Sequence, residues 1–231
     1  MKNGNIVEVT NVTKVYRQGK LDVHALRGLT LPVEKGEFTA LCGPSGSGKT
    51  TLLNIIGALD SPTSGSVILE GNDLSGLTRK ELSEIRRDRI GFVFQAYNLM
   101  PVLTAYENAE IVMWVQGIEY EKRRERVSSL LAEVGLADLG DRLPSELSGG
   151  QQQRVAIARA IAANPAVVLA DEPTANVDSE TANTLLDIME KLNREHGVTF
   201  IFSTHDPRVM DRARRLVRLV DGKVTEDERR S

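Results

Sequence analysis

The sequence is short of cysteine and of long apolar runs, and each shortage excludes a class of protein. Its 231 residues include a single cysteine, Cys42, so no disulfide forms within the chain, as is typical of a reducing compartment. No uncharged apolar run approaches the roughly 18 residues that a membrane-spanning helix needs. The first ten residues also lack the apolar core of a signal peptide. If the protein works at a membrane, we expect it to be a peripheral subunit.

An excess of positive charge is also missing. Lysine and arginine number 29 against 32 aspartates and glutamates, which gives a net charge of −3 and an isoelectric point near 5.8. A nucleic-acid-binding domain usually carries a basic face, so we expect no nucleic-acid partner. Hydrophobic residues make up 41% of the chain, which is enough for a sizeable core in one large domain or in a domain with a subdomain.

Apolar patterning alternates between short buried runs and longer periodic stretches. This alternation is typical of an α/β domain with a mostly parallel sheet. We expect one domain over 1–231, with a helical subdomain over about 96–160. Ser179 is the expected N-cap of a helix that ends at His196, and the charged tail 225–231 is expected to be solvated. Strands are expected near 6–12, 26–33, 37–43, 66–71, 90–95, 167–172 and 198–206 and in a hairpin over 215–224, and helices near 48–59, 79–89, 104–115, 120–134 and 179–196.

The stretch GPSGSGKT fits the pattern G-x-x-x-x-G-K-[ST] and stands between a predicted strand and a predicted helix. Its glycines let backbone N–H groups approach phosphate oxygens, and the helix N-terminus adds positive potential. Lys49 is expected to reach the β- and γ-phosphates and the Thr50 hydroxyl to ligate Mg²⁺, the alternative being an ordinary glycine turn. Cys42, beside the loop, is better explained as a small buried strand residue than as a redox thiol. The expected nucleotide-binding residues here are Gly43, Pro44, Ser45, Gly46, Ser47, Gly48, Lys49, Thr50 and Thr51.

Polar side chains end three other predicted strands. Asp171 and Glu172 close VVLADE, where Asp171 is expected to hold Mg²⁺ and Glu172 to orient or deprotonate the attacking water. An acidic strand end that caps the next turn is the alternative. Gln95 and His205 close two further strands and are expected to face the nucleotide, because ligands bind at the carboxyl ends of strands in an open parallel sheet. The catalytic candidates are Glu172, His205 and Gln95, and the candidate Mg²⁺ ligands are Thr50, Gln95 and Asp171.

The stretch LSGGQQQRVAIARA, residues 147–160, holds no nucleophile and no metal ligand, yet it places two glycines and three glutamines before a buried helix. Together with GPSGSGKT, Gln95, VVLADE, ANVD and His205, it resembles the ATPases of ATP-binding-cassette (ABC) transporters over nearly the whole chain. GTPases, kinases and recombinase-type ATPases carry phosphate loops but lack LSGGQ. The resemblance implies a phosphate-loop NTPase core with a mostly parallel sheet, an antiparallel β subdomain and a helical subdomain. It also implies hydrolysis of ATP with Mg²⁺.

The resemblance further implies that LSGGQ contacts ATP bound to a second copy of the chain. Bare glycine backbones, a serine hydroxyl and a helix N-terminus suit a γ-phosphate, although a plain loop ahead of a helix is the alternative. Two ATP molecules would then lie between head-to-tail copies in a C2 dimer. Asp178 would link the two sites, and Tyr16 would stack on adenine unless it is simply a half-exposed strand tyrosine. The segment comprises Leu147, Ser148, Gly149, Gly150 and Gln151.

Within the ABC family the sequence is nearest to the ATPases of lipoprotein-release and macrolide-export systems, the LolD/MacB type. The likeness lies in 90–110, 147–162 and 173–181, where Ala175 replaces a usual glycine and Val177 a usual leucine. It implies an FtsX-like membrane permease as partner and a peripheral location on the cytoplasmic face of the inner membrane. A cell-division-type or importer ATPase and a soluble ABC protein outside transport are the alternatives.

Apolar residues follow Gln95 closely, and two explanations for them stay open. They form either a groove that receives a cytoplasmic helix of the permease or part of the core of the helical subdomain. In the first case Gln95 would act as a hinge that couples the nucleotide state to the permease. These residues are Tyr97, Leu99, Met100, Leu103 and Tyr106.

Overall fold

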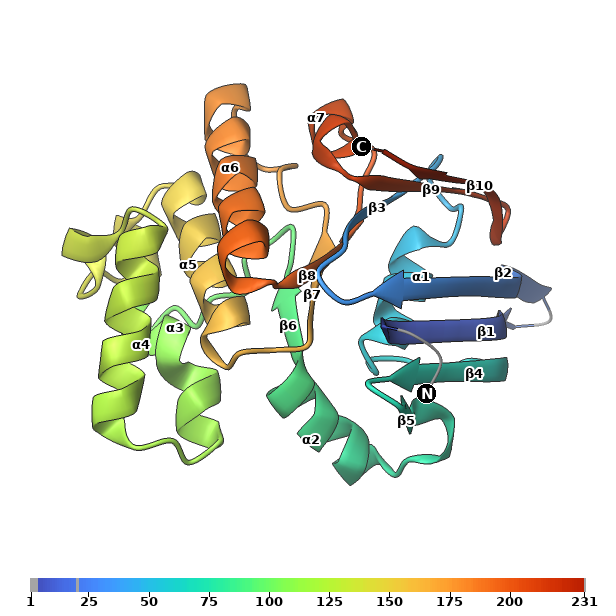
Figure 1. Ribbon diagram of the computed structural model, residues 1–231, viewed down its shortest axis with the longest axis horizontal. Helices are drawn as coiled ribbons and strands as arrows, with labels where there is room; N and C mark the ends of the chain where they lie inside the picture. The colour runs from blue at the N-terminus through green and yellow to red at the C-terminus, as the bar shows by residue number, and fades with distance from the viewer. Residues whose placement is uncertain (1–3, 20, 231) are drawn as a thin grey trace.

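The computed structural model describes residues 4–19 and 21–230, in which two sheets and a set of helices are arranged in layers (Figure 1). The strands are β1 (Asn5–Gln18), β2 (Leu21–Glu34), β3 (Phe38–Cys42), β4 (Ser64–Leu69), β5 (Asn72–Asp73), β6 (Ile90–Val93), β7 (Val167–Asp171), β8 (Thr199–Ser203), β9 (Arg215–Val220) and β10 (Lys223–Arg229). The α-helices are α1 (Lys49–Ile56), α2 (Arg79–Arg89), α3 (Ala105–Val115), α4 (Tyr120–Glu133), α5 (Gly149–Ala162), α6 (Ser179–His196) and α7 (Pro207–Arg212). No helix in this described part is long and apolar enough to cross a membrane.

Parallel pairing dominates the larger sheet, whose order is β10-β9-β3-β8-β7-β6. The strands from β9 to β6 run parallel, and β10 pairs antiparallel with β9. β3 and β8 are buried along their whole length and β7 as far as Ala170, as expected for strands covered on both faces. Their carboxyl ends meet along one edge of the sheet. The loops that follow β3, β6, β7 and β8 therefore all start there.

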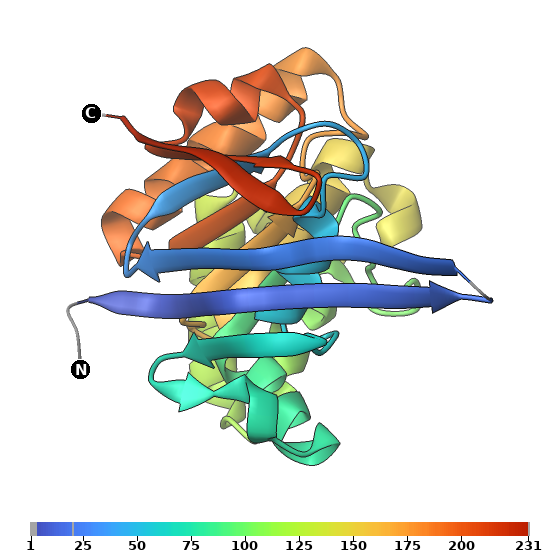
Figure 2. The ribbon, with the colours of Figure 1, turned by 90° about the vertical axis from the view of Figure 1, so that its right-hand side faces the viewer.

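Two hydrophobic clusters cover the two faces of this sheet. Phe200 and Phe202 face the cluster that holds α3 to α6, whereas Ile201 between them faces α1 and the smaller sheet, because successive side chains of a strand point to opposite faces. The smaller sheet is antiparallel, has the order β2-β1-β4-β5, and forms the outer layer seen in Figure 2. The mixed α/β architecture with an antiparallel sheet agrees with the expected fold class.

β1 and β2 extend well beyond the strands expected near 6–12 and 26–33, since each has 14 residues. The apolar alternation fades in the added length, where Leu21 is 73% and Val23 44% exposed. Backbone pairing continues there regardless, for example between Tyr16 and Val23. Burial patterns therefore could not reveal this part of the hairpin.

The prediction that Ser179 caps α6 is wrong, because Asp178 is the N-cap. Asp178 has extended backbone angles, and its carboxylate accepts a hydrogen bond of 2.9 Å from the backbone N–H of Thr181. Ser179 is the first helical residue. Aspartate and serine are both good N-cap residues, so the sequence alone did not show which of the two caps α6.

The charged tail is exposed as expected over 225–229, but most of it forms a strand and not a free end. β10 continues to Arg229 along β9, and its Asp227 accepts two hydrogen bonds of 2.8 Å from Arg215, which is 4% exposed. Arg215 also donates to Glu37 at 2.9 Å. Hydrogen bonds from Arg215 lower the pKa of Asp227, and bonds to Asp227 and Glu37 raise the pKa of Arg215. Ion pairs with neighbouring strands thus hold this exposed edge strand in place.

We expect Arg215→Met to lower the free energy of unfolding by about 2–3 kcal/mol, near the low end for breaking a buried ion pair because Asp227 keeps some solvent. Chemical denaturation would measure the change. The matched control is Arg218→Met on the same strand, whose pair with Glu226 is exposed on both sides, so its replacement is expected to change the stability little. Equal losses in the two variants would contradict the assignment of β10 as a strand held by Arg215.

Candidate functional site

A cavity of about 680 Å³ lies at the carboxyl edge of the parallel strands. The phosphate-loop residues 43–51 line it, together with Tyr16, Gln95, Glu172 and His205. The structure thus brings side chains from the loops after β3, β6, β7 and β8 to one place, with Tyr16 of β1 at its side. Three β2 residues that the sequence did not single out, Val23, His24 and Ala25, complete the wall.

The phosphate loop needs its glycines for packing as well as for ligand approach. Gly43 and Gly48 have φ angles of +147° and +101°, and a Cβ would lie 2.1 Å from the carbonyl oxygen of Leu219 at the first and 2.6 Å from that of Ala25 at the second. α1 begins directly after Gly48. Its N-terminus supplies the free N–H groups and positive potential that favour a phosphate.

Lys49 lies folded across the phosphate loop. Its ammonium donates to the carbonyl oxygens of Gly43 at 2.8 Å and Pro44 at 3.0 Å, and no described carboxylate forms an ion pair with it. Its positive charge therefore stays available to an anion in the cavity. Cys42, just before the loop, is buried, and burial raises the pKa of its thiol. A raised pKa disfavours the reactive thiolate, in line with a packing role.

Three oxygen-bearing side chains suit a magnesium ion. The Thr50 hydroxyl donates to Asp171 Oδ1 at 3.2 Å, which joins the start of α1 to the end of β7, and Gln95 lines the same cavity. No group of three or more histidines, cysteines, aspartates or glutamates that could hold a metal occurs among the described residues. One carboxylate with a hydroxyl and an amide oxygen fits Mg²⁺, which protein sites usually bind with few carboxylates and with substrate phosphates.

Glu172 and His205 form the most specific contact in the cavity. Glu172 Oε1 lies 2.6 Å from His205 Nδ1, and Oε2 accepts a bond of 3.2 Å from the Thr204 hydroxyl. The Glu172 side chain is 18% exposed and that of His205 is 74% exposed. Glu172 also has a left-handed φ of +46°, a conformation that costs free energy and concentrates at functional sites. A half-buried carboxylate held by two neighbours is suited to orienting a water molecule.

Tyr16 is fixed at the cavity wall by contacts that the sequence did not reveal. Its hydroxyl donates to Asp60 Oδ2 at 2.8 Å, and the ammonium of Lys14 lies 4.8 Å from its ring centroid while pairing with Asp60. Burial and the bond to Asp60 raise the pKa of Tyr16. Because Asp60 stands 44 residues away in an irregular segment, no local pattern pointed to it.

The LSGGQ segment forms the start of α5, and none of its side chains lines the described cavity. Ser148 and Gln151 form a capping box, in which the Ser148 N–H donates to Gln151 Oε1 at 2.8 Å and the Gln151 N–H donates to Ser148 Oγ at 3.3 Å. The spacing of a serine and a glutamine three residues apart is the known sequence signature of this cap and could have predicted it.

The two glycines of LSGGQ, which we call the signature segment, pack tightly against other parts of the same chain; α5, which begins within this segment, is the signature helix. A Cβ on Gly149 would lie 2.7 Å from the hydroxyl oxygen of Tyr97, and one on Gly150 would lie 2.3 Å from Cγ2 of Thr181. Asp178, in contrast, is exposed, and hydrogen bonds from Thr181 lower its pKa. The start of α5 therefore sits against the loop after β6 and against α6.

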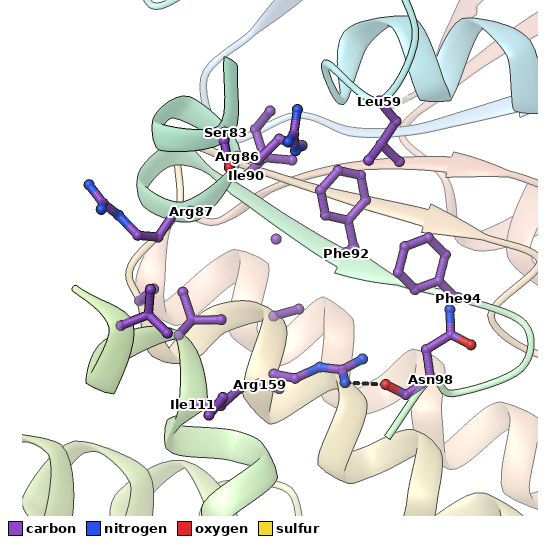
Figure 3. A pocket seen from close by; sticks show the side chains of 15 residues that line it. Leu59, Ser83, Arg86, Arg87, Ile90, Phe92, Phe94, Asn98, Ile111 and Arg159 are labelled. Carbon is purple, nitrogen blue, oxygen red and sulfur yellow. Dashed lines mark hydrogen bonds between the residues drawn. The ribbon is translucent and has the colours of Figure 1, made fainter. Parts of the chain in front are cut away.

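A second cavity, of about 430 Å³, lies between α2, β6, α3 and α5 (Figure 3). Its apolar wall includes Phe92 and Phe94, whose rings stack with centroids 5.5 Å apart, and Ile111 faces them from α3. Arg86 and Arg159 add positive charge to the lining. The apolar residues that follow Gln95 are not part of this lining. Leu99 and Tyr106 instead pack against the helical core, and Met100 is exposed.

Comparison with known proteins identifies relatives over nearly the whole chain. The family model described as ABC transporter matches residues 26–175. The macrolide export ATP-binding/permease protein MacB of Syntrophobacter fumaroxidans is 49% identical over 94% of this chain, which spans only 31% of that relative. An ABC transporter ATP-binding protein of Thermotoga maritima is 46% identical over 97% of this chain and 96% of its own length.

A solved structure matches as well. The dimeric ATP-binding cassette MJ0796 of Methanocaldococcus jannaschii, in a post-hydrolysis state bound to ADP and Pi, is 45% identical and superposes with a TM-score of 0.89. The match covers 96% of this chain and 98% of that one. From the family match and from this likeness in sequence and structure, we conclude that the chain belongs to the ABC transporter family and is an ATPase of its MacB/LolD type.

Proposed function

We propose that two copies of this chain close head to tail around two ATP molecules, and that the cycle of closure and hydrolysis drives a membrane permease. One observation carries the proposal. The cavity assembles the phosphate loop, Gln95, Glu172 and His205, while the chain's own LSGGQ residues line no part of it. The start of α5, with its two glycines, is then free to bind an anion that is held by another molecule.

Within the cavity we assign each side chain a role on the nucleotide. Lys49 leaves its two carbonyl partners or shares their bonds to contact the β- and γ-phosphates, and Tyr16 stacks on the adenine. Thr50, Asp171 and Gln95 hold Mg²⁺, which neutralises charge on the phosphates when bound. In phosphoryl transfer the protein mainly positions groups and stabilises charge, and this set of residues supplies both.

The attacking water is assigned to Glu172. Its carboxylate orients the water in line with the γ-phosphorus and accepts a proton as the new P–O bond forms and the bond to the leaving ADP breaks. His205, 2.6 Å from the same carboxylate, keeps Glu172 in place and contacts the γ-phosphate. The left-handed backbone at Glu172 aims the side chain into the cavity.

The dimer gives hydrolysis a mechanical consequence. Leu147, Ser148, Gly149, Gly150 and Gln151 of one copy bind the γ-phosphate held by the other, so ATP adds contacts that exist only in the closed state and shifts the population toward closure. Loss of the γ-phosphate removes the bridge and lets the copies separate. Asp178 connects the two sites across the interface. The dimeric form of the MJ0796 cassette with ADP and Pi supports this arrangement.

The partner is proposed to be a permease of the FtsX-like type, with the chain on the cytoplasmic face of the inner membrane. The MacB relatives named ATP-binding/permease proteins support a permease, since this chain spans only 31% of one such protein. The apolar cavity between α2, β6, α3 and α5 suits the apolar side of a helix from that partner. Residues of about 96–160 are proposed to move as a helical subdomain when that helix is engaged.

Glu172→Gln tests the water-orienting role. We expect ATP binding to persist and turnover to fall by about 100-fold or more, because the amide cannot accept the proton, so that an ATP-bound dimer accumulates. Phosphate release and size-exclusion chromatography with ATP would measure both. Glu125→Gln, on the exposed side of α4, is the matched control. A variant that hydrolyses ATP normally, or one that stays monomeric with ATP, would count against the proposal.

Lys49→Ala tests the phosphate contact. Removing one charge-assisted donor is expected to weaken ATP binding by about tenfold or more, as measured by isothermal titration calorimetry. Lys122→Ala, whose side chain is 72% exposed on α4, should leave the affinity unchanged. Equal affinities in the Lys49 variant and the unmodified protein would remove Lys49 from the site.

A further inference from the structure

The third glutamine of LSGGQQQ, Gln153, is fully buried in α5. Its amide nitrogen donates to the carbonyl oxygen of Pro173 at 2.7 Å and lies 3.4 Å from that of Phe94. Pro173 follows Glu172, and Phe94 precedes Gln95. One buried side chain therefore joins the signature helix to both loops that carry the proposed water-orienting and metal-binding residues.

Those two loops are also tied to each other. Asn176 donates from Nδ2 to the carbonyl oxygen of Gln95 at 2.9 Å, and the Tyr97 hydroxyl donates to the carbonyl oxygen of Asn176 at 3.3 Å. On the other side, Arg159 of α5 donates to the carbonyl oxygens of Tyr97 and Asn98. The loop after β6, the loop after β7 and α5 thus form one hydrogen-bonded unit.

Both loops adopt conformations that need such support. Tyr97 and Asn98 have φ angles of +58° and +50°, and Glu172 has a φ of +46°. Left-handed backbone at residues other than glycine persists only where surrounding contacts hold it. The bonds from Gln153 and Arg159 end on carbonyl groups within or next to these strained positions.

The chemistry of Gln153 indicates that its donor group is what matters. The oxygen Oε1 has no hydrogen-bond partner and is buried, which costs free energy. An apolar side chain of similar length would fill the same space without that cost. A buried amide that leaves its acceptor unsatisfied while its donor bridges two loops is suited to holding those loops.

We propose that Gln153 is a positioning residue that fixes Gln95 and Glu172 relative to the signature helix, so that a displacement of α5 is transmitted to both. The inference rests on the roles proposed for Gln95 and Glu172. It adds a path within one copy. ATP held by a partner binds at LSGGQ, and the bridge at Gln153, two residues past the end of that segment, sets the geometry of the copy's own site.

Gln153→Met tests the bridge, because methionine keeps the length and removes both donors. We expect kcat to fall about 10- to 100-fold, as misplaced catalytic groups do, while the affinity for ATP changes by less than about twofold, because none of the nucleotide-binding residues is altered. Steady-state ATPase kinetics and calorimetric titration would separate the two effects.

Asn193→Leu is the matched control. Asn193 is also a buried amide, and it donates to the carbonyl oxygens of Gly36 at 2.9 Å and Val198 at 2.6 Å, in the loops that precede β3 and β8. Asn193 Oδ1 also accepts a hydrogen bond from Arg214, so its replacement should lower the melting temperature at least as much as Gln153→Met does but leave kcat within about twofold. If both variants lose kcat in proportion to their stability, Gln153 is only a packing residue and the proposal is wrong.

Asn176→Ala covers the case in which Gln153→Met does not fold. Asn176 is exposed, so its loss spares the core but breaks the second bridge between the same loops. We expect a several-fold lower kcat at unchanged ATP affinity. The inference would be overturned if Asn176→Ala had a normal kcat and Gln153→Met either had a normal kcat or failed to fold. If Glu172→Gln abolishes turnover while these variants remain fully active, the site assignment stands and only the positioning role fails.

Discussion

Parallel pairing in the six-stranded sheet is the constraint on which the site depends. β3, β8, β7 and β6 are neighbours in the sheet and run in one direction, so their carboxyl ends coincide. The phosphate loop, His205, Glu172 and Gln95 follow these strands in that spatial order, although they are spread over more than 160 positions of the chain. A one-residue shift in the pairing of any of these strands would turn its last side chain to the other face and break the cavity.

Two sets of contacts constrain the start of the signature helix. Gly149 and Gly150 leave no room for a Cβ against Tyr97 and Thr181 of the same chain, and the proposed dimer needs the same bare backbone for a γ-phosphate. A substitution at either glycine therefore disturbs the packing inside one copy before it affects a second one. Ser148 is the cleaner position for testing the interface, since its hydroxyl lies on the helix end and only caps it.

How much the sequence revealed depends on whether a feature is local. The phosphate loop, the strand-end carboxylates and most strands and helices are encoded in short stretches, and patterning located them, although it missed the short elements β5 and α7. The tether from Tyr16 to Asp60, the bridge from Gln153 and the pairing of Arg215 with Asp227 each join single polar residues that are remote in sequence or face an unexpected neighbour. Such contacts follow from the packed fold, not from periodicity, and the second cavity arises from four separate elements in the same way.

The central claim is that each reaction site is completed by a second copy, and a mixing experiment tests it most directly. Lys49→Ala has an intact signature but a damaged phosphate loop, and Ser148→Arg has the reverse, so each homodimer is expected to be inactive. A mixed dimer contains one intact composite site. In an equimolar mixture about half of the dimers are mixed, so ATPase activity should recover to about a quarter of that of the unmodified protein. Full activity of Ser148→Arg alone, or no recovery on mixing two folded and inactive variants, would contradict the claim.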